Sequence, residues 1–232
     1  MKIFPTIQII DRDTQAASRK SRSAIELGAD GVYLIDEYNG NLNNRILFET
    51  YQRLRTDSSD KYIGINMFGF GPHGAILALA KSISASKDVL LPPSGLWVSD
   101  MYQDDLHPSV AIEIKNSDPN IKNTRLLGGV AYKYTNTYTE DPIKASYETE
   151  RLKDYVDVVV TSADNYNKDL MINKIIAMKK AAGSKPVAVA GVISAQSLPQ
   201  LEGIVDEVIL LEYYSNQKKL DEIIQLAHSL AN

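Results

Sequence analysis

The sequence predicts a (β/α)8 barrel, and three observations support this fold class. Short apolar segments rich in β-branched residues alternate with longer segments of helical spacing along the 232 residues. The apolar segments begin about every 30 residues, which is the length of one βα unit. The first of them leads into Asp11, Arg12 and Asp13 without a glycine. The alternative, an open doubly wound sheet, normally has a glycine-rich phosphate loop at that point.

Eight apolar runs predict strands buried on both faces, because each is short and bounded by turn residues. They are residues 3–10, 31–35, 62–67, 95–98, 125–134, 156–161, 186–192 and 205–211. Apolar residues three and four positions apart predict helices in the segments between them. These are residues 14–28, 41–55, 73–84, 143–155, 169–182, 197–204 and 220–230. No Pro- or Ser-rich linker divides the chain, so we expect one domain over residues 1–232.

Composition narrows the class of protein. The chain has 25 Lys and Arg against 29 Asp and Glu, a net charge of −4, and 44% hydrophobic residues, as expected for a folded domain. The chain has no excess of basic residues, so its composition does not favour binding to nucleic acid. The absence of cysteine excludes disulfides, thiolate catalysis and Cys-based zinc sites. No apolar run reaches the roughly 18 residues of a transmembrane segment, and no signal peptide is evident. We therefore expect a cytoplasmic protein, and a homo-oligomer is compatible with the sequence.

The barrel prediction locates the candidate active site, because the chemistry of such barrels lies at the carboxyl ends of the strands. Carboxylates follow the second, fourth and eighth predicted strands, at Asp36, Asp100 and Glu212. Lys133 stands between two tyrosines inside the fifth apolar run. We predict that these four residues are catalytic.

Further polar residues at the strand ends are predicted to bind substrate. Amide, hydroxyl and imidazole groups supply hydrogen bonds there, and a glycine lets a ligand approach the backbone. These residues are Gln8, Asn66, His73, Thr161, Ser162 and Gly191. Loops are polar in any protein, so some of these residues are explained by their position in a loop alone.

Lys133 has three interpretations. Burial can lower the pKa of a lysine so that its amine forms a Schiff base with a carbonyl substrate. A charged lysine can instead bind a phosphate or carboxylate. The third interpretation is a structural lysine that extends its ammonium toward solvent and pairs with Asp100 or Glu212.

The three carboxylates are compatible with Mg²⁺, which prefers oxygen ligands, and equally with general acid–base catalysis. No spacing motif favours either, so we predict no metal site and no required cofactor, with Mg²⁺ as an option. His73 and His107 are expected in loops after the third and fourth strands, hence on one face. There they can shuttle a proton or be ordinary loop histidines.

Several blocks of sequence resemble known barrels. Residues 28–36 (GADGVYLID), 63–67 (IGINM), 156–161 (VDVVVT) and 187–193 (VAVAGVI) are similar to the BtpA/SgcQ family, and residues 95–100 and 127–134 to a related barrel branch. The resemblance implies a phosphate-binding type of TIM barrel, in a family with one member linked to photosystem I biogenesis and others encoded beside sugar-metabolism genes. The chain departs from the family pattern after the sixth, seventh and eighth strands, where groups suited to phosphate are missing.

Two classes of function follow. The first is an enzyme, a lyase, isomerase or hydrolase, that acts on a small polar metabolite such as a sugar, sugar-phosphate or nucleoside at the carboxyl face. The second is a non-catalytic, BtpA-like assembly or binding protein with a degenerate phosphate site. An enzyme requires Lys133 and at least two of the carboxylates in one pocket. In the second class, Tyr and Leu side chains are expected to plug the mouth of the barrel.

Overall fold

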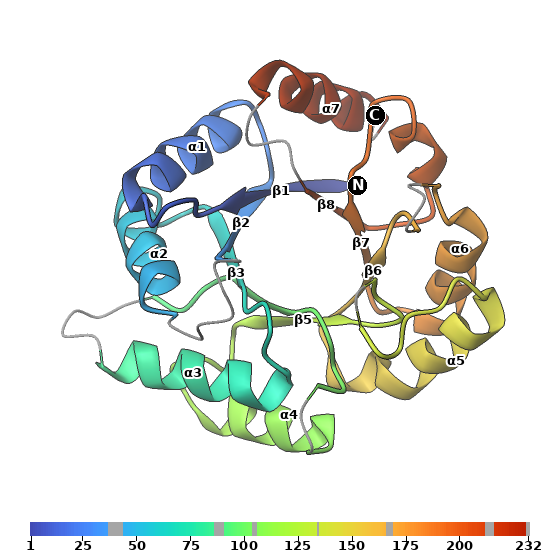
Figure 1. The fold of residues 1–232 in the computed structure, drawn as a ribbon, viewed down its shortest axis with the longest axis horizontal. Helices are drawn as coiled ribbons and strands as arrows, with labels where there is room; N and C mark the ends of the chain where they lie inside the picture. Colours follow the sequence, from blue (N-terminus) through green and yellow to red (C-terminus); the bar gives the residue numbers. More distant parts are fainter. Residues whose placement is uncertain are drawn as a thin grey trace.

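The computed structural model describes residues 1–36, 44–85, 91–103, 106–133, 135–165, 169–211 and 216–230. Eight parallel strands close into a barrel in the order β1 to β8, and helices surround it (Figure 1). Each strand pairs with its sequence neighbours, and β1 closes the ring by pairing with β8. The predicted (β/α)8 fold class is confirmed, and the open sheet is excluded.

The elements follow the alternation that the sequence indicates. The strands are β1 (Lys2–Gln8), β2 (Gly31–Ile35), β3 (Tyr62–Asn66), β4 (Gly95–Val98), β5 (Arg125–Gly129), β6 (Val158–Ser162), β7 (Val187–Gly191) and β8 (Glu207–Leu210). The α-helices are α1 (Thr14–Glu26), α2 (Arg45–Asp57), α3 (Pro72–Ala85), α4 (Pro108–Ser117), α5 (Pro142–Leu152), α6 (Ile172–Ala182) and α7 (Gln217–Leu230). Two 3-10 helices, η1 (Lys153–Tyr155) and η2 (Leu198–Leu201), complete the set in the described residues.

Three differences from the predicted elements matter. Helix α4 was not expected; the His107 ring caps it by accepting from the Ser109 N–H, and Pro108 opens it. The helix predicted at 197–204 is only the 3-10 turn η2. Strand β5 ends at Gly129 instead of continuing to residue 134, because Ala131 has a φ of 48°, which no strand residue adopts. Lys133 therefore lies in a turn and not in a strand.

The alternation of side chains along each strand produces two apolar layers. One layer packs the barrel wall against the helices. The other fills the barrel interior and is drawn almost entirely from the strands. Its largest fully buried members are Trp97, Tyr33 and Phe4, and the Tyr33 ring meets the Phe4 and Trp97 rings edge to face at centroid distances of 5.8 and 6.0 Å. The interior of the barrel is thus a packed aromatic core.

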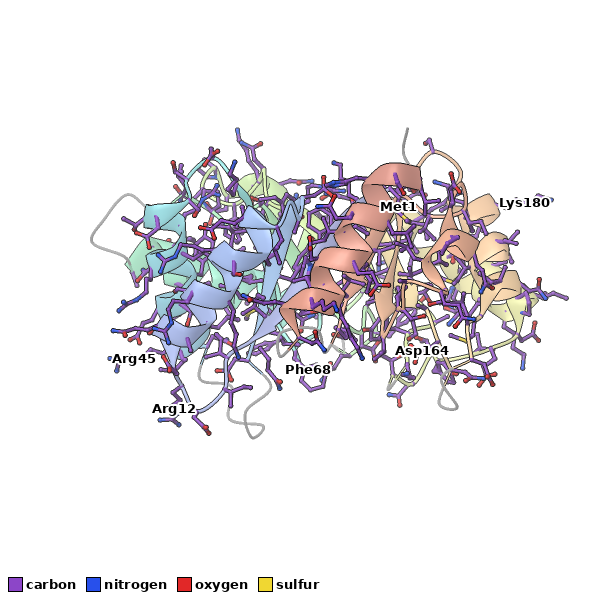
Figure 2. The ribbon with its side chains drawn as sticks, turned by 90° about the horizontal axis from the view of Figure 1, so that it is seen from above. Met1, Arg12, Arg45, Phe68, Asp164 and Lys180 are labelled. Atoms are coloured by element: carbon purple, nitrogen blue, oxygen red, sulfur yellow. The ribbon has the colours of Figure 1, made fainter. Side chains whose placement is uncertain are left out.

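The two ends of the barrel are distinct in Figure 2. Arg12, Phe68 and Asp164, from the loops that follow β1, β3 and β6, lie on one side, whereas Met1, which precedes β1, lies on the other. The loops at the carboxyl ends of the strands therefore share one face, as expected for this fold. Within the described residues, no helix has the length and apolar character needed to cross a membrane.

Candidate active site at the carboxyl ends of the strands

A cavity of about 320 Å³ opens where β3, β4 and β5 end. It is lined by loop residues from these three units, namely Phe68, Gly69, Ser99, Asp100, Gln103, Tyr132, Lys133, Thr135 and Asn136. Two of the four predicted catalytic residues, Asp100 and Lys133, thus line one cavity although they lie on different βα units. Asp36 is not among its lining residues and Glu212 lies outside the described residues, so the described cavity holds one of the two carboxylates that we expected of an enzyme. The loop after β3 is tied to the loop after β4 by the Gln103 Nε2–H, which donates to the Gly69 carbonyl at 2.9 Å.

The turn after β5 carries Lys133 to this cavity. The N–H of Val130 continues the ladder to the Val160 carbonyl at 2.8 Å, and the chain then bends at Ala131. The backbone N–H of Lys133 donates to the Ser162 hydroxyl oxygen at 2.6 Å. The Lys133 ammonium donates to Asp164 Oδ2 at 3.0 Å and to the Asn165 carbonyl at 3.3 Å. Lys133 is thereby fixed at both its backbone and its charged end.

The pair of Lys133 and Asp164 is largely withdrawn from water, with side chains 14% and 6% exposed. An ammonium held by a carboxylate lacks the free electron pair that Schiff-base formation needs, so this geometry disfavours that interpretation. The remaining oxygen of Asp164, Oδ1, is buried without a hydrogen-bond partner in the described part of the chain. A Cβ on Gly191 would stand 2.6 Å from that oxygen. Gly191 therefore leaves the space that the Asp164 carboxylate occupies.

Asp100 is held in the turn after β4. Its Oδ1 accepts from the Tyr102 N–H at 2.9 Å, and the residue is only 7% exposed. One carboxylate oxygen thus has a fixed orientation at the wall of the cavity. A carboxylate placed in this way can accept a hydrogen bond from a ligand or exchange a proton with it.

Below the cavity, polar atoms reach into the barrel interior. The Asn66 amide donates to the Trp97 carbonyl at 3.4 Å and to the hydroxyl of Ser99, which lines the cavity, at 3.5 Å. Asn66 Oδ1 and Trp97 Nε1 are buried and have no hydrogen-bond partner among the described residues. Buried polar atoms are normally hydrogen-bonded, so this acceptor and this donor mark a polar region of the interior at the carboxyl end of the barrel.

Two predicted binding residues support the β5 turn. Ser162 accepts from the Lys133 N–H, as described above. Thr161 is fully buried, and its hydroxyl donates to the Ala131 carbonyl at 3.4 Å. Both contacts are made to the polypeptide near Lys133. Binding of a ligand by either residue stays a prediction.

The other predicted residues are distributed around the same face. Gln8 ends β1, Asp36 follows β2, and His73 lies in the first turn of α3, each partly exposed and each engaged in interactions. Their roles stay predictions. Glu212 lies outside the described residues.

His107 takes a structural position. Besides capping α4, its ring packs edge-on against Tyr155, at a centroid distance of 5.1 Å. Tyr155 belongs to η1, which precedes β6 and so lies toward the amino end of that strand. This contact does not support the expectation that His107 faces the same site as His73.

Metal ligation gains no support from the described residues, which contain no group of three or more His, Asp or Glu side chains suited to hold an ion. Because Glu212 is not described, the trio of Asp36, Asp100 and Glu212 proposed for Mg²⁺ stays a prediction.

A second charge pair lies at the opposite end of the barrel. Arg125, at the start of β5, donates to the Glu207 carboxylate at the start of β8, with 2.7 Å between the nitrogen and Oε1. The hydroxyls of Tyr33 and Tyr62 lie 2.7 Å apart beside it. Burial raises the pKa of Tyr33 well above its usual value, so this phenol stays neutral. The sequence alone did not single out this cluster.

No family model and no curated protein sequence matches this chain, so the resemblance to the BtpA/SgcQ family stays a prediction. Solved barrels match over nearly the whole chain. Orotidine 5′-phosphate decarboxylase from Pyrococcus horikoshii OT3 has a TM-score of 0.67 and 9% identity, with 99% of each chain covered.

Two other solved structures show the same likeness. Orotidine 5′-monophosphate decarboxylase from Methanocaldococcus jannaschii has a TM-score of 0.67 and 13% identity, covering 100% of this chain and 99% of its own. The tryptophan synthase A-subunit from Pyrococcus furiosus has a TM-score of 0.66 and 12% identity, covering 99% and 97%. At such identities the likeness shows the (β/α)8 fold.

Proposed function

We propose that this chain is a small-molecule-binding barrel and an enzyme that acts on a sugar, sugar-phosphate or nucleoside-type metabolite. The observation that carries the proposal is the meeting of Lys133 and Asp100 at one cavity on the carboxyl face. Its volume of about 320 Å³ falls at the lower end of the range for ligand sites, roughly 300–1,000 Å³. The cavity therefore suits a small metabolite.

The side chains of the cavity assign roles to parts of the ligand. Lys133 offers a positive charge to a phosphate, a carboxylate or a polarised carbonyl, and its contact with Asp164 holds the ammonium in place. Asp100 accepts hydrogen bonds from ligand hydroxyls or moves a proton. Phe68, whose side chain is 50% exposed, offers an apolar surface to a sugar or base ring. A ligand with one anionic group and one ring satisfies all of these groups.

The solved barrels support this assignment by analogy. Two of them are decarboxylases named for orotidine 5′-phosphate, a nucleoside that carries a phosphate. Shared architecture does not fix function, because one fold hosts many reactions. The analogy favours phosphate-bearing ligands as the first to be tested.

A second candidate function is binding without turnover, as in the BtpA-like alternative. Trp97 and Tyr132 pack edge to face at 6.0 Å in the barrel interior, and Tyr132 also lines the cavity. The charge of Lys133 is already compensated by Asp164. Both observations favour a site that holds a ligand without a free nucleophile or base. A bound ligand that stays chemically unchanged distinguishes this function from an enzyme.

Thermal-shift measurement with a panel of sugars, sugar phosphates, nucleosides and nucleotides tests the proposal. A ligand present at 100 times its Kd stabilises the native state by about 2.7 kcal/mol. For a chain of this length, this raises Tm by about 5–10 °C. Hits are then incubated with the protein and followed by NMR for chemical change.

Two variants make the screen specific. Lys133→Met is expected to abolish the ligand shift relative to its own Tm. Lys179→Met, which removes a half-exposed ion pair between α6 and Asp206, is the matched control and is expected to keep it. A panel with no hit, or a hit that Lys133→Met binds equally well, contradicts the proposal.

A further inference from the structure

A second lysine stands behind the cavity. Lys174, in the first turn of α6, is only 1% exposed, and its ammonium donates to the Ala131 carbonyl at 2.6 Å. Lysine is among the residues least often buried, because a buried ammonium loses its hydration. Burial accordingly lowers its pKa to about 8. An apolar side chain would fill this space without such a loss, so the ammonium has a specific task here.

That task concerns the point at which the chain leaves the barrel wall. Ala131, with its φ of 48°, is one of three described non-glycine residues with positive φ. This backbone conformation is unfavourable for an L-residue and persists only where its surroundings enforce it. The Ala131 carbonyl accepts from Lys174 and from Thr161, both buried. Two donors thus hold the strained turn that leads directly into Tyr132 and Lys133.

Charged and polar groups around Lys174 connect the loop after β5 with the loop after β6. Glu140, before α5, attracts the Lys174 ammonium, and its carboxylate accepts from the Tyr138 hydroxyl at 2.9 Å and the Asn165 amide at 3.3 Å. The Lys174 nitrogen lies 5.3 Å from the centre of the Tyr138 ring, a cation–π distance. Asn165 also accepts from Lys133 through its carbonyl. Lys174 therefore contacts the loop after β5, and Glu140 of that loop binds Asn165 of the loop after β6. Lys133 joins the same two loops at the cavity.

We propose that Lys174 is a positioning residue which, by holding the Ala131 carbonyl, fixes the turn that sets Lys133 against Asp164 at the cavity. The inference rests on the proposed function, in which Lys133 is the cation that meets the ligand. Loss of the Lys174 ammonium releases the turn at Ala131. The Lys133 side chain then leaves Asp164 more often and becomes accessible to solvent.

Acetylation of Lys133 in the native protein tests this directly. The variant Lys174→Met is treated with an amine-reactive acetylating reagent at pH 7, and the rate at Lys133 is read by peptide mass spectrometry. We expect a rate at least about five times that of the unaltered protein, because local opening controls access to a protected group. Lys174→Arg, which keeps a charged donor, is expected to restore the slow rate.

Lys115→Met is the matched control. Lys115 is also a buried lysine that donates to a carbonyl, that of Lys122 at 3.0 Å, but it lies on α4 and not behind the β5 turn. Its loss is expected to reduce stability and leave the Lys133 rate within about twofold of the unaltered protein, because distant sites act independently. If Lys174→Met behaves like Lys115→Met, Lys174 only stabilises the fold and the proposal is overturned.

A second variant and a comparison with the metabolite panel complete the test. Should Lys174→Met fail to fold, Lys174→Gln replaces it with the same expectation, since the shorter side chain cannot reach the Ala131 carbonyl. The labelling contains no ligand, so its outcome is independent of the metabolite panel. Fast labelling with an empty panel overturns the proposed function and upholds the positioning of Lys133. Slow labelling with a confirmed ligand overturns the positioning alone.

Discussion

The two ends of this barrel each bury a pair of opposite charges, and the surroundings of the two pairs differ. At the amino end, Arg125 and Glu207 come from regular strands, and the guanidinium lies over the Tyr62 ring at 5.9 Å. At the carboxyl end, Lys133 and Asp164 come from turns after β5 and β6, and Lys133 lines a cavity. Burial of charge alone therefore does not identify a functional site.

The backbone explains the contrast. Arg125 and Glu207 are positioned by the strand ladders, so their geometry follows from the barrel itself. Lys133 depends on a strained turn with two buried donors and on side-chain contacts from the next loop. The amino-end pair serves the fold, whereas the carboxyl-end pair combines a specific geometry with open space. Substitutions at five positions test these two roles.

The largest effect is expected from Arg125→Met. It leaves the Glu207 carboxylate, whose side chain is 4% exposed, without its partner. Breaking a buried pair by removing one partner costs about 3–5 kcal/mol, and the partial exposure of Arg125 places the expected loss near 3 kcal/mol. Urea unfolding measures this loss. The ligand-induced Tm shift is expected to persist in this variant. A stability loss below about 1 kcal/mol would contradict the expected difference between the two charge pairs.

Lys133→Met is expected to reverse this pattern. The stability loss is about 2 kcal/mol, since the Asp164 carboxylate is left unpaired near a solvent-open cavity. The ligand-induced shift disappears. The double variant Lys133→Met with Asp164→Asn removes both charges and is expected to regain part of the stability but none of the ligand response. If the double variant binds the ligand, the Lys133 ammonium is not needed for binding.

The pH dependence of stability distinguishes Lys174 from Arg125. The Lys174 pKa is about 8 in the folded chain against 10.5 for an ordinary lysine, because burial disfavours its charge. Between these pH values the unfolded chain holds a proton that the folded chain has released, so stability rises with pH. The free energy of unfolding relative to Lys174→Met is expected to rise by about 1.5 kcal/mol from pH 8 to 9.5. Urea unfolding at both pH values checks this, and a flat difference would contradict it.

Phe68→Ala is expected to have the smallest effect. Phe68 is half exposed in the loop after β3, so stability should change by less than about 0.5 kcal/mol. If a ligand ring stacks on Phe68, its affinity falls about threefold to tenfold. Isothermal titration with the strongest hit of the panel measures this fall. If the affinity of Phe68→Ala for the ligand is unchanged, the ligand ring does not stack on Phe68.

The fold was predictable from the sequence because buried parallel strands are continuous apolar runs at regular spacing. Helix α4 was missed because Val110, Ile112 and Ile114 alternate with a period of two, which is typical of a strand. The end of β5 was also missed. The run from Val130 to Tyr132 stays apolar in sequence, and nothing in it indicates the positive φ of Ala131.

The candidate site was predictable only in part. Lys133 and Asp100 were found because each polar group interrupts or ends an apolar run. Asp164 was not among the predicted site residues, because its pairing with a lysine 31 residues away depends on the closed barrel. Lys174 carries no sequence signal at all, since a lysine near a helix start is normally exposed. Contacts between loops of different βα units are the part that sequence patterns do not reveal.

The proposed site is tested most directly by mapping the strongest metabolite hit on the protein by backbone amide NMR. The largest chemical-shift changes are expected at Ser99, Asp100, Tyr132 and Lys133, which follow β4 and β5 at their carboxyl ends. A larger cavity of about 730 Å³ between α2 and α3, lined by Phe48 and Lys81 among others, is the competing location. Changes centred there, with the amides around Lys133 unmoved, would contradict the proposed site.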